Sequence, residues 1–109
     1  RVEDFSELTL ELLDELKSLE PYGLGNQEPV FLLPEVRVVE AAKLGADQRH
    51  LRLVVWDHFG NSLKLMSFYA SEDYLNIQGG ETLNAWITLS ENNYRGIRSV
   101  EGRILRLAD

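Results

Sequence analysis

The sequence has no cysteine, and it has only two histidines and three prolines among its 109 residues. Without cysteine there is no disulfide and no thiol chemistry, which favours a cytoplasmic location. No apolar run approaches the ~20 residues that a membrane helix needs. The first residues are acidic, without the apolar segment of a signal peptide and without an initiator methionine, so we expect a piece of a longer protein.

The acidic charge of the chain is confined to its first third. The net charge is −7. Residues 1–35 hold two basic and nine acidic side chains, whereas residues 36–109 hold nine of each. Near the C-terminus, four arginines face one acid, Glu101, so this part is locally basic. This distribution argues against a dedicated, tight nucleic-acid binder but permits weak or assisted binding.

The beginning of the chain predicts one amphipathic helix over about residues 10–19. Its apolar side chains recur at a spacing that places them on one helical face: Leu8, Leu12, Leu16 and Leu19. Ser6 or Thr9 is the expected N-cap. The acids on the opposite face are expected to be solvated, and the apolar face is expected to pack on the rest of the chain or on a neighbouring domain.

Two prolines and two glycines within residues 20–29 predict a hinge after this helix. Pro21 disfavours the α region for Glu20 and should end the helix there. Gly23 and Gly25 can take a positive φ at little steric cost, and Asn26 tolerates it better than most residues. We therefore divide the chain into a helix and hinge over residues 1–29, linking to a preceding domain, and a β domain over residues 30–109. The hinge residues are Pro21, Tyr22, Gly23, Gly25, Asn26 and Pro29.

The rest of the chain alternates as β-strand. Strands are predicted over about residues 30–39, 50–56, 62–69, 83–89 and 97–107, with turns at 43–48, 57–61 and 90–96. Pro34 requires an edge, bend or bulge. Ser71 and two acids behind it predict a short helix between the third and fourth strands. This order favours a mainly β fold, a five-stranded OB-fold Greek-key barrel, over a sandwich of about seven strands.

Catalytic and metal-binding residues are scarce. The histidines are His50 and His58, and the neighbouring pair Asp57-His58 does not define a metal site or a dyad. Gly23 and Gly25 precede a strand, so they lack the helix N-terminus that binds phosphate. We expect no enzyme activity, metal or cofactor in this chain.

A binding surface is more plausible, on the outward side of the second strand. OB barrels bind single strands through basic side chains along the backbone and aromatic platforms for bases. The candidate DNA-binding residues are Arg37, His50, Arg52, Trp56, Lys64, Arg95 and Arg98, the last two as a rim in the turn between strands four and five. The alternative is that Trp56 covers a barrel end or packs under the helix, with the arginines merely solvated.

The hinge also carries a family resemblance. The run from Leu19 to Phe31, LEPYGLGNQEPVF, resembles the LEPFGxGNPEPxF signature that opens the OB domain of RecJ, the single-strand-specific DNA exonuclease. Further similarities follow in order over about residues 7–107: Gly45 with His50-Leu51-Arg52-Leu53, Phe68 at the end of strand three, and Asn92-x-Tyr94-x-Gly96. Gln27 departs from the signature proline, and Glu101-Gly102 departs from the family's QL pair in strand five.

The resemblance implies a parent enzyme that removes nucleotides from the 5′ end of single-stranded DNA in repair and recombination, with manganese or magnesium. In that family the metal-binding Asp/His motifs and the GGGH motif lie in two preceding domains, and neither occurs here. This chain would be an OB module without nuclease activity that grips the strand and helps close the ring around it. The implied partners are single-stranded DNA, the preceding catalytic domains and a single-strand-binding protein.

A second hypothesis is a structural or protein-docking module that positions the catalytic domains. The acidic helix, its apolar face and the neutral β part support it.

Overall fold

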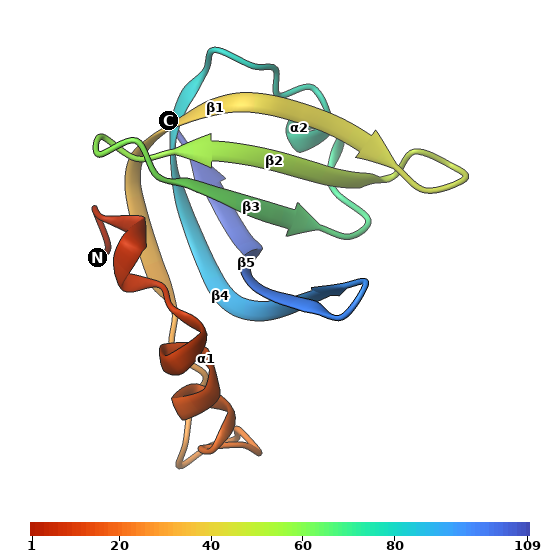
Figure 1. Cartoon of the computed structure of the whole chain (residues 1–109). Coiled ribbons are helices and arrows are strands. Elements are labelled where there is room, and N and C mark those ends of the chain that lie inside the picture. Colours follow the sequence, from red (N-terminus) through yellow and green to blue (C-terminus); the bar gives the residue numbers. More distant parts are fainter.

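The computed structural model describes residues 1–109 as a closed barrel of five strands (Figure 1). A helical stalk over residues 10–29 projects from this barrel. The elements in order are the 3-10 helix η1 (Phe5–Glu7), α1 (Leu10–Lys17), β1 (Phe31–Leu44), β2 (His50–Trp56), β3 (Ser62–Ser67), α2 (Glu72–Leu75), β4 (Thr82–Tyr94) and β5 (Ile97–Ala108). The strands close in the order β1-β2-β3-β5-β4, with β3 and β5 parallel. This confirms the predicted mainly β, OB-like architecture with its two helices. None of the helices has the length and apolar character needed to cross a membrane.

The barrel core follows from the alternation of apolar side chains along the strands. Leu51, Leu53 and Val55 of β2 all point inward and are at most 1% exposed. On β3, whose inward parity the sequence leaves open, Leu63 and Leu65 are the buried positions. The side chains between these positions point outward, and so they are available for binding.

Two local features close the barrel. The pairing of β1 with β4 shifts register between Leu33 and Val36, around Pro34, which confirms the predicted bulge. On β5, Gly102 is buried where the strands approach closely. A Cβ built there would lie 2.6 Å from Cδ2 of Leu65 and 2.8 Å from Cδ1 of Ile87, so only glycine fits without a shift of its neighbours.

Three strand boundaries differ from the predicted ones. β1 continues to Leu44, and β3 ends at Ser67, before the two aromatic residues that follow it. The predicted turn over 90–96 is wrong for most of its length: β4 runs to Tyr94 and pairs with β5 throughout, leaving only Arg95 and Gly96 in the turn. Polar residues are suited to this extension because the hairpin projects past the barrel, where neither face needs to be apolar.

The hinge also differs in its backbone. α1 is capped by Thr9 and ends at Lys17. Gly23, Gly25 and Asn26, which tolerate a positive φ, do not adopt one. The turn is closed instead by two backbone hydrogen bonds, from N of Gly23 to O of Asn26 at 2.7 Å and back at 3.1 Å. The Asn26 amide also donates to the carbonyls of Leu19 and Pro21, so it ties the turn to the end of the helix.

The first eight residues pack as part of the barrel. Val2, Phe5 and Leu8 are buried in the same hydrophobic cluster as the strand residues. The backbone N–H of Val2 donates to O of Leu32 at 2.8 Å, and this bond attaches the N-terminal segment to the beginning of β1. The domain boundary at residue 29/30 stays a prediction, and this packing shows that the N-terminal residues stabilise the barrel.

Candidate nucleic-acid interface

The outward side chains of β1, β2 and β3 form one face of the barrel. The strand register pairs Trp56 with Arg37 of β1, and Val54 with Lys64 of β3. Since the intervening residues point into the core, these side chains point outward. The structure therefore brings five of the seven candidate DNA-binding residues onto one surface, called the outer face below: Arg37, His50, Arg52, Trp56 and Lys64.

Arg52 lies in the middle of the outer face. It pairs with Met66 of β3, which pairs in turn with Arg103 of β5, so a row of outward side chains crosses three strands. The Arg52 guanidinium forms an ion pair of 2.9 Å with Glu40. Its Nε atom is buried and has no hydrogen-bond acceptor. One donor of Arg52 is therefore unsatisfied within this chain.

Trp56 is accessible at the end of β2. Its side chain is 49% exposed. With Arg37 and His58 it lines a shallow depression of about 460 Å³, which also includes Glu35, Asp57 and Thr82. The alternative that Trp56 of β2 packs under the N-terminal helix α1 is wrong, because α1 packs against β4 and β5.

His50 is held in place by its neighbours. Its Nδ1 atom accepts a hydrogen bond of 3.1 Å from the backbone N–H of Tyr69. Its ring makes edge contacts with Phe68 and Tyr69, at centroid distances of 5.1 and 4.8 Å. The guanidinium of Arg103 lies 4.7 Å from the Phe68 ring centroid. The candidate set omits Phe68, Tyr69 and Arg103, although two successive aromatics at a strand end were a usable signal.

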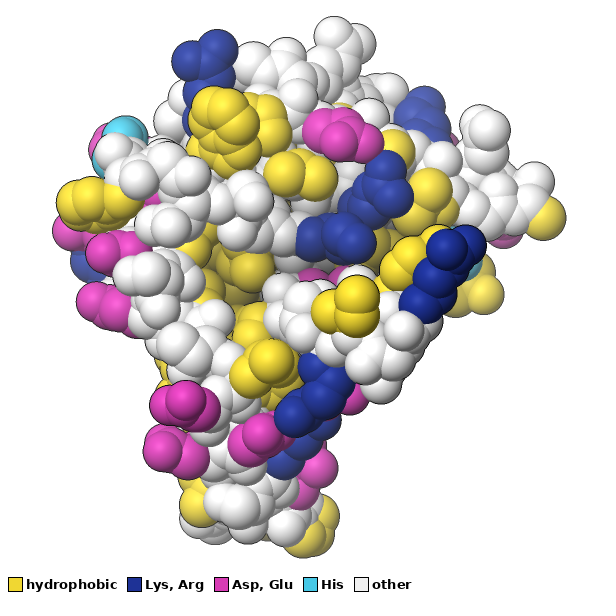
Figure 2. Space-filling model, viewed as in Figure 1, with side chains coloured by type: hydrophobic (Ala, Val, Ile, Leu, Met, Phe, Trp, Pro, Cys, Tyr) yellow, Lys and Arg dark blue, Asp and Glu magenta, His cyan; other side chains and the backbone are white.

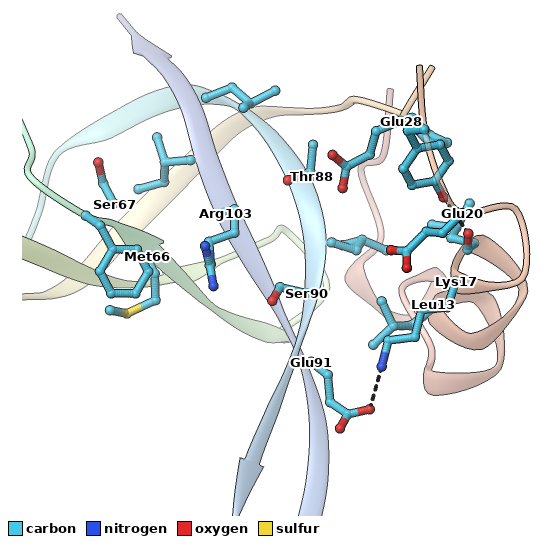
Figure 3. Close-up of a pocket in the computed structure, with 17 residues that line it drawn as sticks. Leu13, Lys17, Glu20, Glu28, Met66, Ser67, Thr88, Ser90, Glu91 and Arg103 are labelled. Carbon is cyan, nitrogen blue, oxygen red and sulfur yellow. Dashed lines mark hydrogen bonds and ion pairs between the residues drawn. The ribbon is translucent and has the colours of Figure 1, made fainter. Parts of the chain in front are cut away.

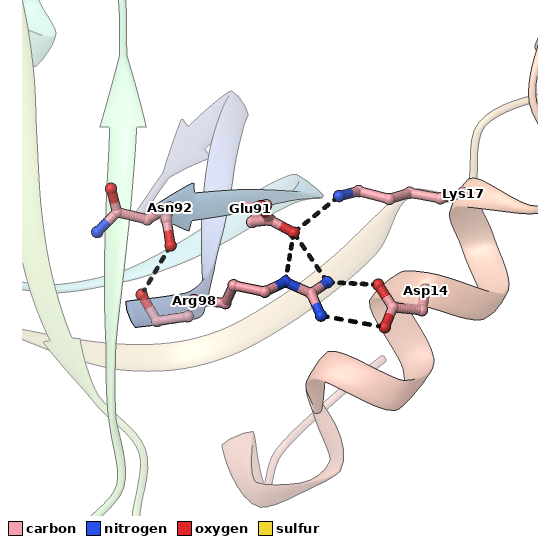
Figure 4. A network of polar contacts seen from close by, with 6 residues as sticks. Asp14, Lys17, Glu91, Asn92 and Arg98 are labelled. Atoms are coloured by element: carbon pink, nitrogen blue, oxygen red, sulfur yellow. Dashed lines mark hydrogen bonds and ion pairs between the residues drawn. The ribbon is translucent and has the colours of Figure 1, made fainter. Parts of the chain in front are cut away.

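The two remaining candidates, Arg95 and Arg98, lie on the β4–β5 hairpin, apart from the outer face. Arg95 sits in the turn with its guanidinium 5.2 Å from the Tyr94 ring centroid. Arg98 pairs with Asp14 of α1 at 2.6 Å and with Glu91 of β4 at 2.8 Å (Figure 4). Lys17 of α1 also pairs with Glu91, at 2.9 Å. These ion pairs join the helix to the hairpin.

This ion-pair network perturbs the pKa of its members. The hydrogen bond from Arg98 lowers the pKa of Asp14, and hydrogen bonds from Lys17 and then Arg98 lower the pKa of Glu91. The same contacts raise the pKa of Arg98. Arg98 therefore keeps its positive charge, and the carboxylates of Asp14 and Glu91 balance that charge within the chain.

A groove of about 560 Å³ separates the helical stalk from the barrel. Figure 3 shows Met66, Ser67 and Arg103 on its barrel side and Lys17, Glu20 and Glu28 on its stalk side. On the face shown in Figure 2, most acidic side chains stand at the left and over the stalk, and most Lys and Arg side chains stand in the right half, some of them beside the stalk. Of the two cations that line the groove, Lys17 is paired with Glu91, so Arg103 on the barrel side is the one that favours an anionic group of a ligand.

The hinge residues shape the stalk side of this groove, where Tyr22 and Pro29 line it. The Tyr22 hydroxyl donates to the carbonyl of Leu16, which holds the hinge against α1. Burial raises the pKa of Tyr22, and the charges of Glu20 and Glu28 raise it further. The hinge thus folds back along the helix and fixes its direction relative to the barrel.

No three His, Cys, Asp or Glu side chains lie close enough together to hold a metal ion. The residues present support binding by cations and aromatic rings.

The fold and this surface define a small OB-fold domain with an accessory helix. Among solved structures, RecJ from Thermus thermophilus in complex with Mg²⁺ is similar, with a TM-score of 0.68 and 29% identity over 91% of this chain. RecJ from the same organism in complex with Mn²⁺ gives a TM-score of 0.69 and 30% identity over 91%. This chain spans 14% of the length of each. The SSB domain of a Synechococcus protein has a TM-score of 0.57 at 16% identity, covering 73% of this chain and 93% of that domain, which shows the fold alone.

The sequence model of the RecJ OB domain matches residues 3–106, nearly the whole chain. The chain therefore belongs to the RecJ OB domain family, as the hinge motif predicted. No curated protein matches the sequence.

Proposed function

We propose that this chain is the single-stranded-DNA-binding OB module of a RecJ-like 5′–3′ exonuclease acting in DNA repair and recombination in the cytoplasm. It has no nuclease chemistry of its own. The preceding catalytic domains of the parent chain carry out the hydrolysis, with manganese or magnesium. The observation that carries the proposal is the outer face, where cations stand beside the exposed ring of Trp56 on a RecJ-family barrel.

The chemistry of the outer face suits a single strand. Cationic side chains bind the phosphates, and aromatic rings stack on bases without sequence preference. Because the β part of the chain has no net charge, the expected binding is weak and falls with added salt. Arg95 adds a cation near the rim. Arg98 contributes least, because its charge is already paired with Asp14 and Glu91.

Titration with a fluorescent oligothymidylate at low salt tests the proposal. We expect a dissociation constant that rises with salt and that rises further in Arg52→Ala and Trp56→Ala. Arg1→Ala is the charge-matched control, since Arg1 is exposed, pairs only with Glu3 and is not one of the candidate DNA-binding residues. The proposal fails if this chain shows no binding at low salt and the two substitutions leave the exonuclease activity of the full-length parent unchanged.

A second function is favoured by apolar side chains exposed around the hinge. Leu19 and Val30 are both 52% exposed, and Leu24 is fully exposed. We infer that this end of the stalk docks on the preceding catalytic domains and positions the barrel, and that a single-strand-binding protein is a further partner. Leu24→Ser should weaken binding of this chain to the separately produced catalytic half, measured by calorimetry. Equal affinity for wild type and variant would contradict this docking role.

A further inference from the structure

Two aromatic side chains at the end of β3 are exposed and held in an unusual backbone conformation. Phe68 is 48% exposed and Tyr69 is 76% exposed. Tyr69 has a φ of 53°, in the left-handed region that bulky residues rarely adopt. Such strain persists only where surrounding contacts impose it, and it is concentrated at functional sites. The conformation holds the Tyr69 ring in solvent and keeps it out of the barrel core.

The contacts that impose this conformation come from His50. Its Nδ1 atom accepts the backbone N–H of Tyr69 at 3.1 Å. Its ring edge contacts both aromatic rings. Gly45, with a φ of 92°, leaves the space that His50 occupies, because a Cβ built there would lie 2.9 Å from Cδ2 of the imidazole. His50 is therefore a positioning residue.

Arg103 supplies a positive charge beside these rings. Its guanidinium lies 4.7 Å from the Phe68 ring centroid, and it takes part in none of the five ion pairs of the structure. Three acids share its groove: Glu20 and Glu28 stand on the stalk side, and Glu91 of β4 is already paired with Lys17 and Arg98 (Figure 3). An unpaired guanidinium beside the exposed Phe68 ring, which shares the His50 imidazole with Tyr69, matches the phosphate and the base of a nucleotide.

We infer that Phe68 and Tyr69 form a base-stacking subsite for single-stranded DNA, with Arg103 binding the adjacent phosphate and His50 setting the ring positions. This deepens the proposed function and rests on it. The subsite continues the outer face, because Arg103 ends the row that begins at Arg52. Stacking on a ring is tolerant of sequence, so the subsite takes any base.

The test compares two single strands about ten nucleotides long, within the site size of an OB fold. One is oligothymidylate and the other is the abasic strand with the same number of phosphates. Wild type should bind the thymidylate strand roughly tenfold more tightly than the abasic strand. Tyr69→Asn removes the ring but tolerates positive φ, and together with Phe68→Leu it should reduce this preference to the part that Trp56 contributes.

Phe59→Leu is the control, because Phe59 is 67% exposed in the hairpin at the opposite end of β2 and β3. It should keep the wild-type preference. His50→Asn retains a side-chain acceptor for the Tyr69 N–H and should keep the preference for the thymidylate strand. His50→Leu has no acceptor and should lose that preference. Circular dichroism establishes that each variant is folded.

The outcomes separate the two proposals. If wild type binds neither strand, and Arg52→Ala and Trp56→Ala leave the exonuclease activity of the full-length parent unchanged, the proposed function fails. If it binds both strands equally, or if the Phe68 and Tyr69 variants keep the wild-type preference for bases, DNA binding stands and the stacking subsite is refuted.

Discussion

Asp57 is the residue through which the N-terminal segment is attached to the barrel. One carboxylate oxygen accepts the backbone N–H of Phe5 at 2.8 Å and the Asn61 amide at 2.9 Å. The other accepts the backbone N–H groups of Phe59 and Asn61, both at 2.9 Å. Asp57→Asn keeps the shape of the side chain but removes its charge and turns one acceptor into a donor. We predict that it loosens both the hairpin turn and residues 1–8.

The size of the effect follows from the pKa of Asp57. Burial alone would raise this pKa, but the hydrogen bonds from Phe5, Asn61 and Phe59 outweigh it and lower the pKa from 3.8 to about 2. One pKa unit corresponds to about 1.4 kcal/mol, so the shift from 3.8 to about 2 gives an upper bound of about 2.5 kcal/mol. Solvent screening at this partly exposed site reduces the expected loss in Asp57→Asn at neutral pH to about 1–2 kcal/mol.

The same shift fixes the sign of the pH dependence. Between pH 3.8 and about pH 2 the unfolded chain protonates Asp57 while the folded chain keeps it ionised. The stabilisation is therefore complete above that window and is lost as the pH falls through it. The difference between wild type and Asp57→Asn should be constant near neutral pH and should shrink across the window.

Urea denaturation, followed by tryptophan fluorescence at a series of pH values, measures this difference. Asp47→Asn is the matched control, because the Asp47 carboxylate is exposed and accepts a single bond of 3.3 Å from Arg49. Its stability should stay close to that of wild type. The reasoning is refuted if Asp57→Asn is as stable as wild type at neutral pH, or if its loss is the same at both ends of the window.

Two further predictions concern the closure of the barrel and the attachment of the helix. Gly102→Ala should destabilise the fold by about 1–3 kcal/mol in urea denaturation, because the added Cβ overlaps Leu65. Gly25→Ala is the control and should be nearly neutral, because the space around Gly25 is open. Equal losses of stability in the two variants would contradict the packing argument. Arg98→Gln should lower the hydrogen-exchange protection factors of the α1 amides and reduce their dependence on salt, leaving the part that the Lys17–Glu91 pair contributes. In wild type these protection factors, corrected for the intrinsic exchange rate, should fall as the pH falls through the lowered pKa of Asp14, and an unchanged salt dependence in the variant would show that the ion pairs of Arg98 do not hold the helix.

The local elements were predictable where a single chemical pattern decides them. β2 has the predicted bounds, residues 50–56, because its apolar residues alternate without interruption between two turns. The Ser71 side chain caps α2 as predicted, by accepting the N–H of Tyr74. The extension of β4 to Tyr94 was missed, because strand pairing with β5 overrides the turn preference of its polar residues.

The binding surface was predictable in part for the same reason. Alternation along β2 placed Arg52 and Trp56 outward, and the register then set Arg37 and Lys64 beside that strand. The register cannot be read from one strand alone. The Phe68–Tyr69 cluster depends on contacts with His50, 19 residues away from Tyr69, and no local pattern encodes them.

By itself, the sequence determined the order of the elements, the inward side of β2, the hinge position and the family, because each depends on neighbouring residues or on a contiguous motif. Only the tertiary structure decided which charged side chains pair with one another and which stay unpaired. Asp14 and Arg98 are 84 residues apart, and only barrel closure brings them to 2.6 Å. Closure thereby turns a predicted DNA contact into an attachment point for the helix, and it leaves Arg103, which sequence reasoning did not select, as the unpaired cation beside the exposed rings.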